Sequence, residues 1–231
     1  MFRRILHLAA ATVALLAAQP VPGPRLLVVT GGHEHDTSFY TLFDGYNATC
    51  AQPNQFAFRA DMRKKFDVLV LYDMMQELND AGRRNLQNFV ESGKGLVVLH
   101  HALADYNDWE WWYHDVMGAK YLLKPALDMP GSTYKHDQEF NVRVAAKHPI
   151  TEGIGDFHIT DEAYKGLWHS PEIKVLLTVD HPLQDTQVAW VSPYTKSRVA
   201  VIQLGHDHEA HQNPSYRKLV KNAIEWAAGR K

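Results

Sequence analysis

The chain has 231 residues, of which 24 are Lys or Arg and 26 are Asp or Glu, so its formal net charge at pH 7 is -2. No basic stripe points to a nucleic-acid partner, and a single cysteine, Cys50, excludes an intramolecular disulfide and a thiolate zinc cluster. Hydrophobic packing must therefore hold the fold together, and 45% hydrophobic residues can fill a single core.

The N-terminal segment predicts export. Arg3 and Arg4 precede an apolar run over residues 5–18 that is too short to span a bilayer comfortably, which is the layout of a secretory signal peptide. We expect residues 1–23 to be this leader and residues 24–231 to form a single domain that lies in the periplasm or outside the cell. An uncleaved N-terminal anchor is the alternative; after cleavage we expect no stable membrane span.

Strand-like apolar runs alternate with helical patterns through the first half of the body, which is typical of βαβ units and a parallel sheet. The expected strands cover residues 25–30, 56–59, 66–72 and 95–99. The expected helices lie near residues 38–46 and from residue 79 or 80 to Gly93.

The second half shows shorter strand patterns, several with polar alternation, which predict an antiparallel extension that returns to a final core strand. These strands are expected over residues 139–144, 158–165, 175–179, 187–190 and 198–204. An amphipathic helix ends the chain, with Asn213 as its N-cap and Pro214 at its first position. The sequence thus predicts an α/β fold with a mostly parallel central sheet.

Histidines and carboxylates gather at the expected carboxyl ends of strands, where open α/β sheets bind their ligands. The polar residues at these strand ends are His33, Glu34, Asp36, Asp73, His100, His101 and His206. Such groups can hold a divalent metal such as zinc, transfer protons or bind sugar hydroxyls, and their spacing does not choose among these roles. For a metal we expect His33, His100 and His206 as ligands, and for substrate binding Glu34, Asp36 and Asp73.

Other chemistries find less support. Trp109 lies in an aromatic segment, residues 106–113, and is predicted to stack on a sugar ring, with core packing as the alternative. Cys50 has no activating base in the sequence around it, and no G-x-S-x-G elbow or dinucleotide fingerprint occurs. Neither nucleophilic catalysis nor an NAD or flavin cofactor is expected.

Several segments, in this order along the chain, resemble the ThuA-like (trehalose utilisation) family. They are GGHEHD, LHHA, GSTYKHDQEFNVRV, FHITDEAY, RVAVIQLGHD and NPSYRKLVKNAIEWAA, and the resemblance runs from about residue 25 to residue 228. It implies a flavodoxin-like, class I glutamine amidotransferase-like sandwich. It also implies a link to disaccharide or keto-sugar breakdown, with a sugar oxidoreductase in the same pathway.

The resemblance extends to individual residues. The positions that match the family motifs are His33, Asp36, His100, His101, His136, Glu162, Tyr164 and His206. It thereby implies His136 and Tyr164 as further substrate-binding residues and Glu162 as a catalytic one. His100 or His101 stands where the amidotransferase pattern has its cysteine, so glutamine hydrolysis by a thiolate is excluded.

Together these observations predict an enzyme that acts on a disaccharide, a glycoside or a keto-sugar. His101 or Glu162 would move a proton, while His33, His100 and His206 would bind or polarise the substrate. The reaction would be that of a lyase, hydratase, isomerase or hydrolase, which the sequence does not rank. The alternative is a non-catalytic carbohydrate-binding or interaction protein that uses the same pocket.

Overall fold

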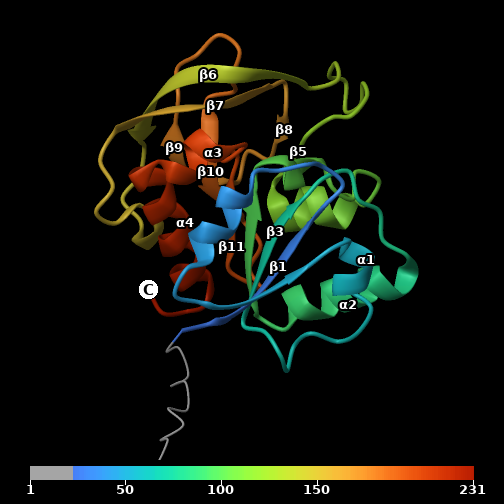
Figure 1. Ribbon diagram of the computed structural model, residues 1–231. Helices are drawn as coiled ribbons and strands as arrows, with labels where there is room; N and C mark the ends of the chain where they lie inside the picture. The colour runs from blue at the N-terminus through green and yellow to red at the C-terminus, as the bar shows by residue number, and fades with distance from the viewer. Residues whose placement is uncertain (1–22) are drawn as a thin grey trace, which may run out of the picture.

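The computed structural model describes residues 23–231, and a nine-stranded sheet runs through it in the order β2-β1-β3-β4-β11-β10-β9-β6-β7 (Figure 1). Apart from Gly23, the expected leader lies outside the described residues. Within residues 23–231, no helix has the length and apolar character needed to cross a membrane.

Five strands form the parallel half of the sheet, and four of them match strands predicted for the first half of the chain and its last core strand. They are β1 (Arg25–Gly31), β2 (Asn47–Ala51), β3 (Val68–Asp73), β4 (Gly95–Leu99) and β11 (Val199–Ile202). β3, β4 and β11 are buried along their whole length, which explains their continuous apolar sequences.

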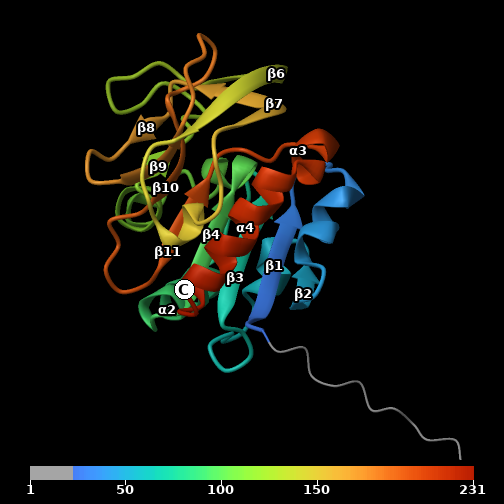
Figure 2. The ribbon, with the colours of Figure 1, turned by 90° about the vertical axis from the view of Figure 1, so that its left-hand side faces the viewer.

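Helices cover both faces of these strands, and alternate strand residues point to the two faces (Figure 2). One face packs on the 3-10 helix η1 (Thr37–Phe43) and on α4 (Pro214–Ala227), the predicted terminal helix. The other packs on α2 (Asp80–Glu91), the 3-10 helix η2 (His100–Ala104) and the π-helix η3 (Trp111–Met117). The predicted N-caps, Asn79 and Asn213, begin α2 and α4.

The prediction of a strand over residues 56–59 is wrong. The second parallel strand is β2, and the residues after it form the short helix α1 (Asn54–Ala57). β2 is an edge strand with mostly exposed or half-buried residues, so no apolar run marks it in the sequence. Its pairing with β1 places it in the sheet, and that pairing is a tertiary contact.

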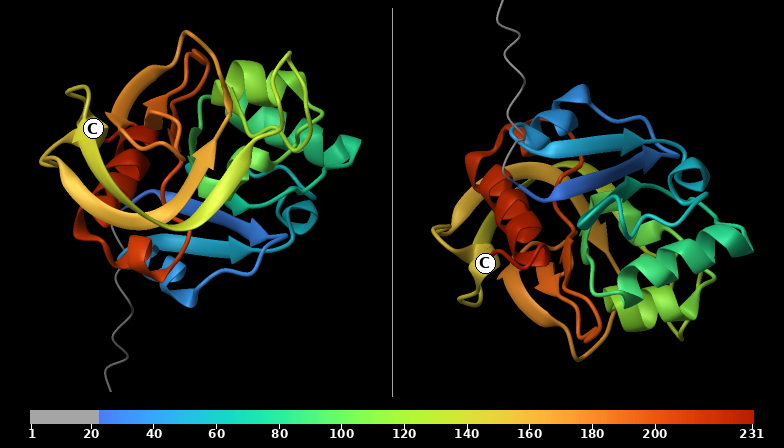
Figure 3. Two further views of the ribbon diagram at one scale, coloured as in Figure 1. Left: turned by 90° about the horizontal axis from the view of Figure 1, so that it is seen from above. Right: turned by 90° about the horizontal axis from the view of Figure 1, so that it is seen from below.

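The antiparallel extension is confirmed. It comprises β6 (Thr133–Val144), β7 (Phe157–Lys165), β9 (Lys174–Thr178) and β10 (Gln187–Val191). The shorter elements of this part of the chain are β5 (Ala119–Lys120), which pairs with β8 (Trp168–His169), the 3-10 helix η4 (Pro149–Thr151) and, after β11, α3 (His208–Gln212). Seen from above, β6 and β7 cross the carboxyl edge of the parallel strands (Figure 3).

The structure therefore confirms a mixed α/β architecture with a large, mostly parallel sheet and an antiparallel extension, consistent with a flavodoxin-like fold.

Candidate functional site

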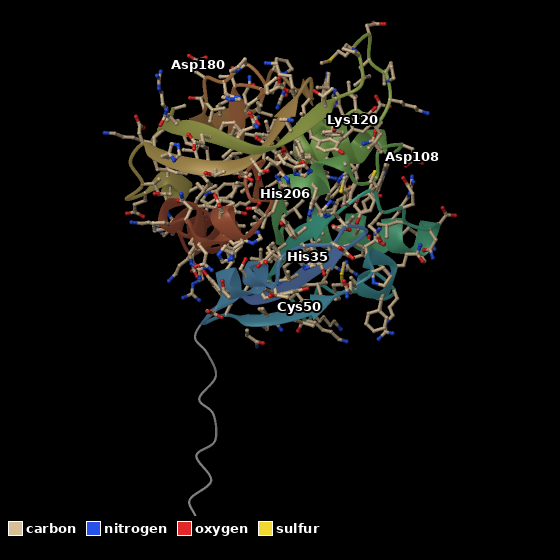
Figure 4. The ribbon with its side chains drawn as sticks, turned by 45° about the horizontal axis from the view of Figure 1, so that its top comes forward. His35, Cys50, Asp108, Lys120, Asp180 and His206 are labelled. Carbon is tan, nitrogen blue, oxygen red and sulfur yellow. The ribbon has the colours of Figure 1, made fainter. Side chains whose placement is uncertain are left out.

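Five histidines from four separate segments meet at the carboxyl edge of the parallel strands. The ring centroid of His33, after β1, lies 5.2 Å from that of His101 and 5.8 Å from that of His206, which follow β4 and β11. The His206 ring is also 5.2 Å from His100 and 4.8 Å from His136 on β6. The structure thus brings together the strand ends that the sequence indicated, and Figure 4 shows His206 near the middle of the molecule.

Glu162 on β7 lies at the centre of this histidine cluster. Its Oε2 is 3.0 Å from His100 Nε2 and 3.9 Å from His206 Nε2, and its Oε1 is 3.1 Å from His136 Nδ1. Burial favours the neutral acid, but the hydrogen bond and the charges of these imidazoles outweigh it, and the pKa of Glu162 is lowered. Glu162 is therefore a buried carboxylate held by three histidines.

His100 follows β4 directly and has a left-handed backbone, with φ 46°. This conformation is uncommon outside glycine and is strained for most residues. It places His100 Nδ1 2.6 Å from the carbonyl of Gln203, and Nε2 3.0 Å from the hydroxyl of Tyr164. Burial opposes protonation of the ring, but Glu162 and Asp161 prevail and raise the pKa of His100.

His101 differs from its neighbour because it has no hydrogen-bond partner among residues 23–231. Only 2% of the residue is exposed, and both ring nitrogens are buried without a partner among the described residues. Its ring packs on Tyr72, with the centroids 4.2 Å apart. Burial, reinforced by the surrounding imidazoles, lowers the pKa of His101 well below its usual value, so the ring is neutral.

A cavity of about 390 Å³ opens beside these groups. Its polar lining comes from His33, His101, Ser132, His136, Glu162 and the tyrosines 121, 134 and 164. Its apolar lining includes Met75 and Leu123, which are half exposed, as is Tyr134. We call Met75, Leu123 and Tyr134 the rim. The cavity thus combines imidazole and carboxylate groups with an apolar rim.

Three residues predicted to bind substrate do not line this cavity. Asp36 caps η1, accepting a 2.7 Å hydrogen bond from the backbone N–H of Ser38. Trp109 packs near Trp112 and beneath the Arg83 guanidinium, so the packing alternative describes it better than stacking on a ligand. Glu34 is exposed on the loop after β1.

Asp73, the fourth such residue, is fully buried behind the cavity. Its carboxyl group lies beside that of Asp105, and its Oδ2 accepts a 3.1 Å hydrogen bond from the Tyr106 hydroxyl. Burial raises the pKa of Asp73 to about 6 and that of Asp105 well above its usual value, so the pair retains a proton that an exposed pair would lose. Asp105 Oδ1 in turn accepts from the backbone N–H of Gln76, which ties η2 to the loop after β3.

Asp161 is a site residue that the sequence analysis missed. Its buried carboxylate accepts hydrogen bonds from the backbone N–H groups of Gly205 at 2.7 Å and His206 at 2.9 Å. It thereby fixes the turn that carries His206. Its position beside Glu162 in the segment ITDEAY is the only sequence signal of this role.

Cys50, predicted to be unreactive, lies on the edge strand β2, away from His206 (Figure 4). Partial burial raises the pKa of its thiol, which disfavours the nucleophilic thiolate.

Solved structures share the fold. A ThuA-like protein from Parabacteroides merdae superposes with a TM-score of 0.78 at 17% identity, covering 90% of this chain and 91% of its own. One from Bacteroides uniformis has a TM-score of 0.69 at 19% identity, covering 94% and 95%. A β-galactosidase from Bacillus circulans matches with a TM-score of 0.57 at 10% identity, over 91% of this chain and 32% of the enzyme.

No curated protein is found as a relative. The sequence profile of one family, ThuA, described as trehalose utilisation, matches residues 25–227 and includes every residue that lines the cavity. The family and the fold agree with the resemblance of the quoted motifs, and we conclude that the chain belongs to the ThuA family.

Proposed function

We propose that the protein is an enzyme of carbohydrate breakdown that performs acid–base chemistry on a disaccharide, a glycoside or a keto-sugar. The family suggests a role in trehalose utilisation. The observation that carries the proposal is His101, a buried imidazole with two unpaired nitrogens in the lining of a polar cavity. Unpaired buried polar groups are costly in a folded protein, so their presence points to a ligand that pairs with them.

The chemistry needs a base on one side of the sugar and a polarising group on the other. A proton on the carbon beside a carbonyl becomes removable when the oxygen is polarised and a base lies within reach. His101 is the base in this proposal, because its nitrogens are free. Glu162, fixed by His100 and His136, belongs to the wall that binds and polarises the oxygen.

The cavity also suits a sugar in size and lining. Its volume of about 390 Å³ is at the lower end of small-molecule pockets, which run from about 300 to 1,000 Å³. Imidazole and carboxylate groups can hydrogen-bond hydroxyls, while Tyr134 and Leu123 at the rim can contact the C–H face of a ring. The same lining would serve a non-catalytic sugar-binding protein, so turnover must be measured separately from binding.

The test compares His101→Asn with His114→Asn, a matched change of an exposed histidine outside the cavity. Trehalose, other disaccharides and their keto derivatives are assayed for binding by calorimetry and for turnover by product analysis. We expect His101→Asn to lower kcat about 100-fold or more and to leave sugar affinity within a few-fold, with His114→Asn unchanged. Binding without turnover would favour the binding protein, and binding of none of these sugars would refute the proposal.

We further propose that the protein works outside the cytoplasm, beside a sugar oxidoreductase that supplies the keto-sugar. The support is the arrangement of Arg3, Arg4 and the apolar run in residues 5–18. Expressed from its full sequence, the protein should be found in the periplasm or medium and be about 20 residues shorter by N-terminal sequencing. A full-length product in the cytoplasm would contradict this location and leave the chemistry of the cavity untouched.

A further inference from the structure

Three donor atoms beside the cavity, one of them on the lining residue Glu162, are spaced as the ligands of a metal ion would be. His100 Nε2, Glu162 Oε2 and His206 Nε2 all lie within 4.8 Å of one another. The distances from the carboxylate oxygen to the two nitrogens are 3.0 and 3.9 Å. Around a tetrahedral ion with bonds of about 2.0–2.1 Å, neighbouring donors are about 3.3 Å apart, so small side-chain movements would complete such a site.

In its neutral form, the ring of His100 has a lone pair that faces the carboxylate of Glu162. Its Nδ1 contacts the carbonyl of Gln203, and because a carbonyl only accepts, Nδ1 carries the hydrogen. A neutral ring then presents an unprotonated Nε2 to Glu162, and a carboxylate also only accepts. The hydroxyl of Tyr164 brings one hydrogen to these two acceptors. The close approach of His100 Nε2 and the Glu162 carboxylate is therefore favourable only if a positive charge lies between them, either a second proton on His100 or a cation.

The surroundings of these donors resemble the outer shell of protein metal sites. Histidine ligands usually donate their second ring N–H to a carbonyl or carboxylate, which fixes the ring, as Gln203 does for His100. Asp161 likewise fixes the backbone of His206 through two hydrogen bonds. The three donor side chains are at most 16% exposed, and together they supply the two-histidine, one-carboxylate set found in catalytic zinc sites.

We propose that His100, Glu162 and His206 bind one divalent cation of the zinc type, with a fourth position left for water or a substrate oxygen. Glu162 takes the place that the sequence analysis gave to His33. The sequence analysis placed Glu162 in the same site as a catalytic residue, and its direct contacts with His100 and His206 depend on how β7 lies over the strand ends, which is a tertiary contact. The cation site rests on these donors alone and holds whether or not the cavity takes a sugar.

The experiment measures the metal itself. Tag-free protein is stripped with a chelator, loaded with Zn²⁺ or Co²⁺ and desalted, and its metal content is determined by mass spectrometry. We expect about one ion per chain, with visible Co²⁺ absorption of the intensity typical of four-coordinate sites. His206→Ala and Glu162→Gln should weaken binding at least 100-fold, while His114→Ala, a change of an exposed histidine outside the cluster, should bind like the wild type.

Circular dichroism melting of each stripped variant separates loss of the site from loss of the fold, and Glu162→Gln keeps the size of the side chain. Three outcomes would overturn the proposal. They are wild-type protein that retains no metal, folded variants that retain as much as the wild type, and a loss in His114→Ala equal to that in His206→Ala. The first would leave a proton alone between His100 and Glu162, and the last would show binding by surface histidines.

Discussion

His100 and His101 are adjacent in the sequence but occupy opposite environments. The left-handed backbone of His100 turns its ring toward Glu162 and Gln203, where every nitrogen has a partner. His101 then faces the cavity without any partner. A strained residue between a strand and a helical turn is a recurring way to present two different groups at one strand end.

At the rim, Tyr134 provides a test of ring contact. It is 61% exposed and lines the cavity, so Tyr134→Ala should cost little stability. If its ring contacts the sugar, the loss of about 0.5–1.5 kcal/mol predicts a KM about two- to tenfold higher with kcat nearly unchanged. Phe56→Ala, which removes another exposed aromatic outside the cavity lining, is the control. An unchanged KM in Tyr134→Ala would show that the substrate does not contact the Tyr134 ring and is bound by the imidazoles of the cavity.

The buried carboxyl pair, Asp73 and Asp105, predicts a pH-dependent stability. Both carboxyl groups have a raised pKa in the fold, so the folded chain holds protons that the unfolded chain releases above about pH 4. Their contribution is present below pH 4 and is lost as the pH rises through the folded values, which for Asp73 is about 6. The free energy of unfolding attributable to the pair should therefore fall with pH, by a few kcal/mol.

Asp105→Asn should remove much of this pH dependence, because an amide carries no charge and can donate to Asp73. Denaturant unfolding measured from pH 4 to 8 gives the slope for the wild type, for Asp105→Asn and for Asp44→Asn, a change of an exposed acid. An equal slope in all three proteins would show that the pair does not share a proton.

Elements whose own residues show their burial pattern could be predicted from the sequence. Elements that depend on pairing with a distant segment could not. β3 and β4 are continuous apolar runs because both faces are covered, and α4 shows a cap and an apolar stripe. β2 is an exposed edge whose place depends on β1, so the sequence pattern favours a strand at the more apolar residues 56–59. The same reasoning located His33, His100 and His206 at strand ends but gave no sign that β7 brings Asp161 to the backbone of His206.

The first turn of α4 offers a stability test at the element scale. Asn213 Oδ1 accepts from the backbone N–H groups of Ser215 and Tyr216, at 3.0 and 3.2 Å, and its amide donates to the carbonyl of His158. Asn213→Ala should lower the free energy of unfolding by about 1–2 kcal/mol, measured by chemical denaturation. Asn213→Asp keeps the capping oxygen and loses only the N–H donor to His158. Its free energy of unfolding should therefore lie between those of the wild type and Asn213→Ala. A smaller loss in Asn213→Ala than in Asn213→Asp would contradict this account.

For the whole molecule, the order of strands in the sheet determines when the chain can finish folding. β11 inserts between β4 and β10, although about 100 residues separate it from β4 in the sequence. Until it arrives, β4 presents an unpaired apolar edge, the kind of surface that drives aggregation of unfinished chains. Contacts between such distant segments also slow folding. A chain that emerges N-terminus first must therefore be shielded from self-association until β11 is released and can pair with β4.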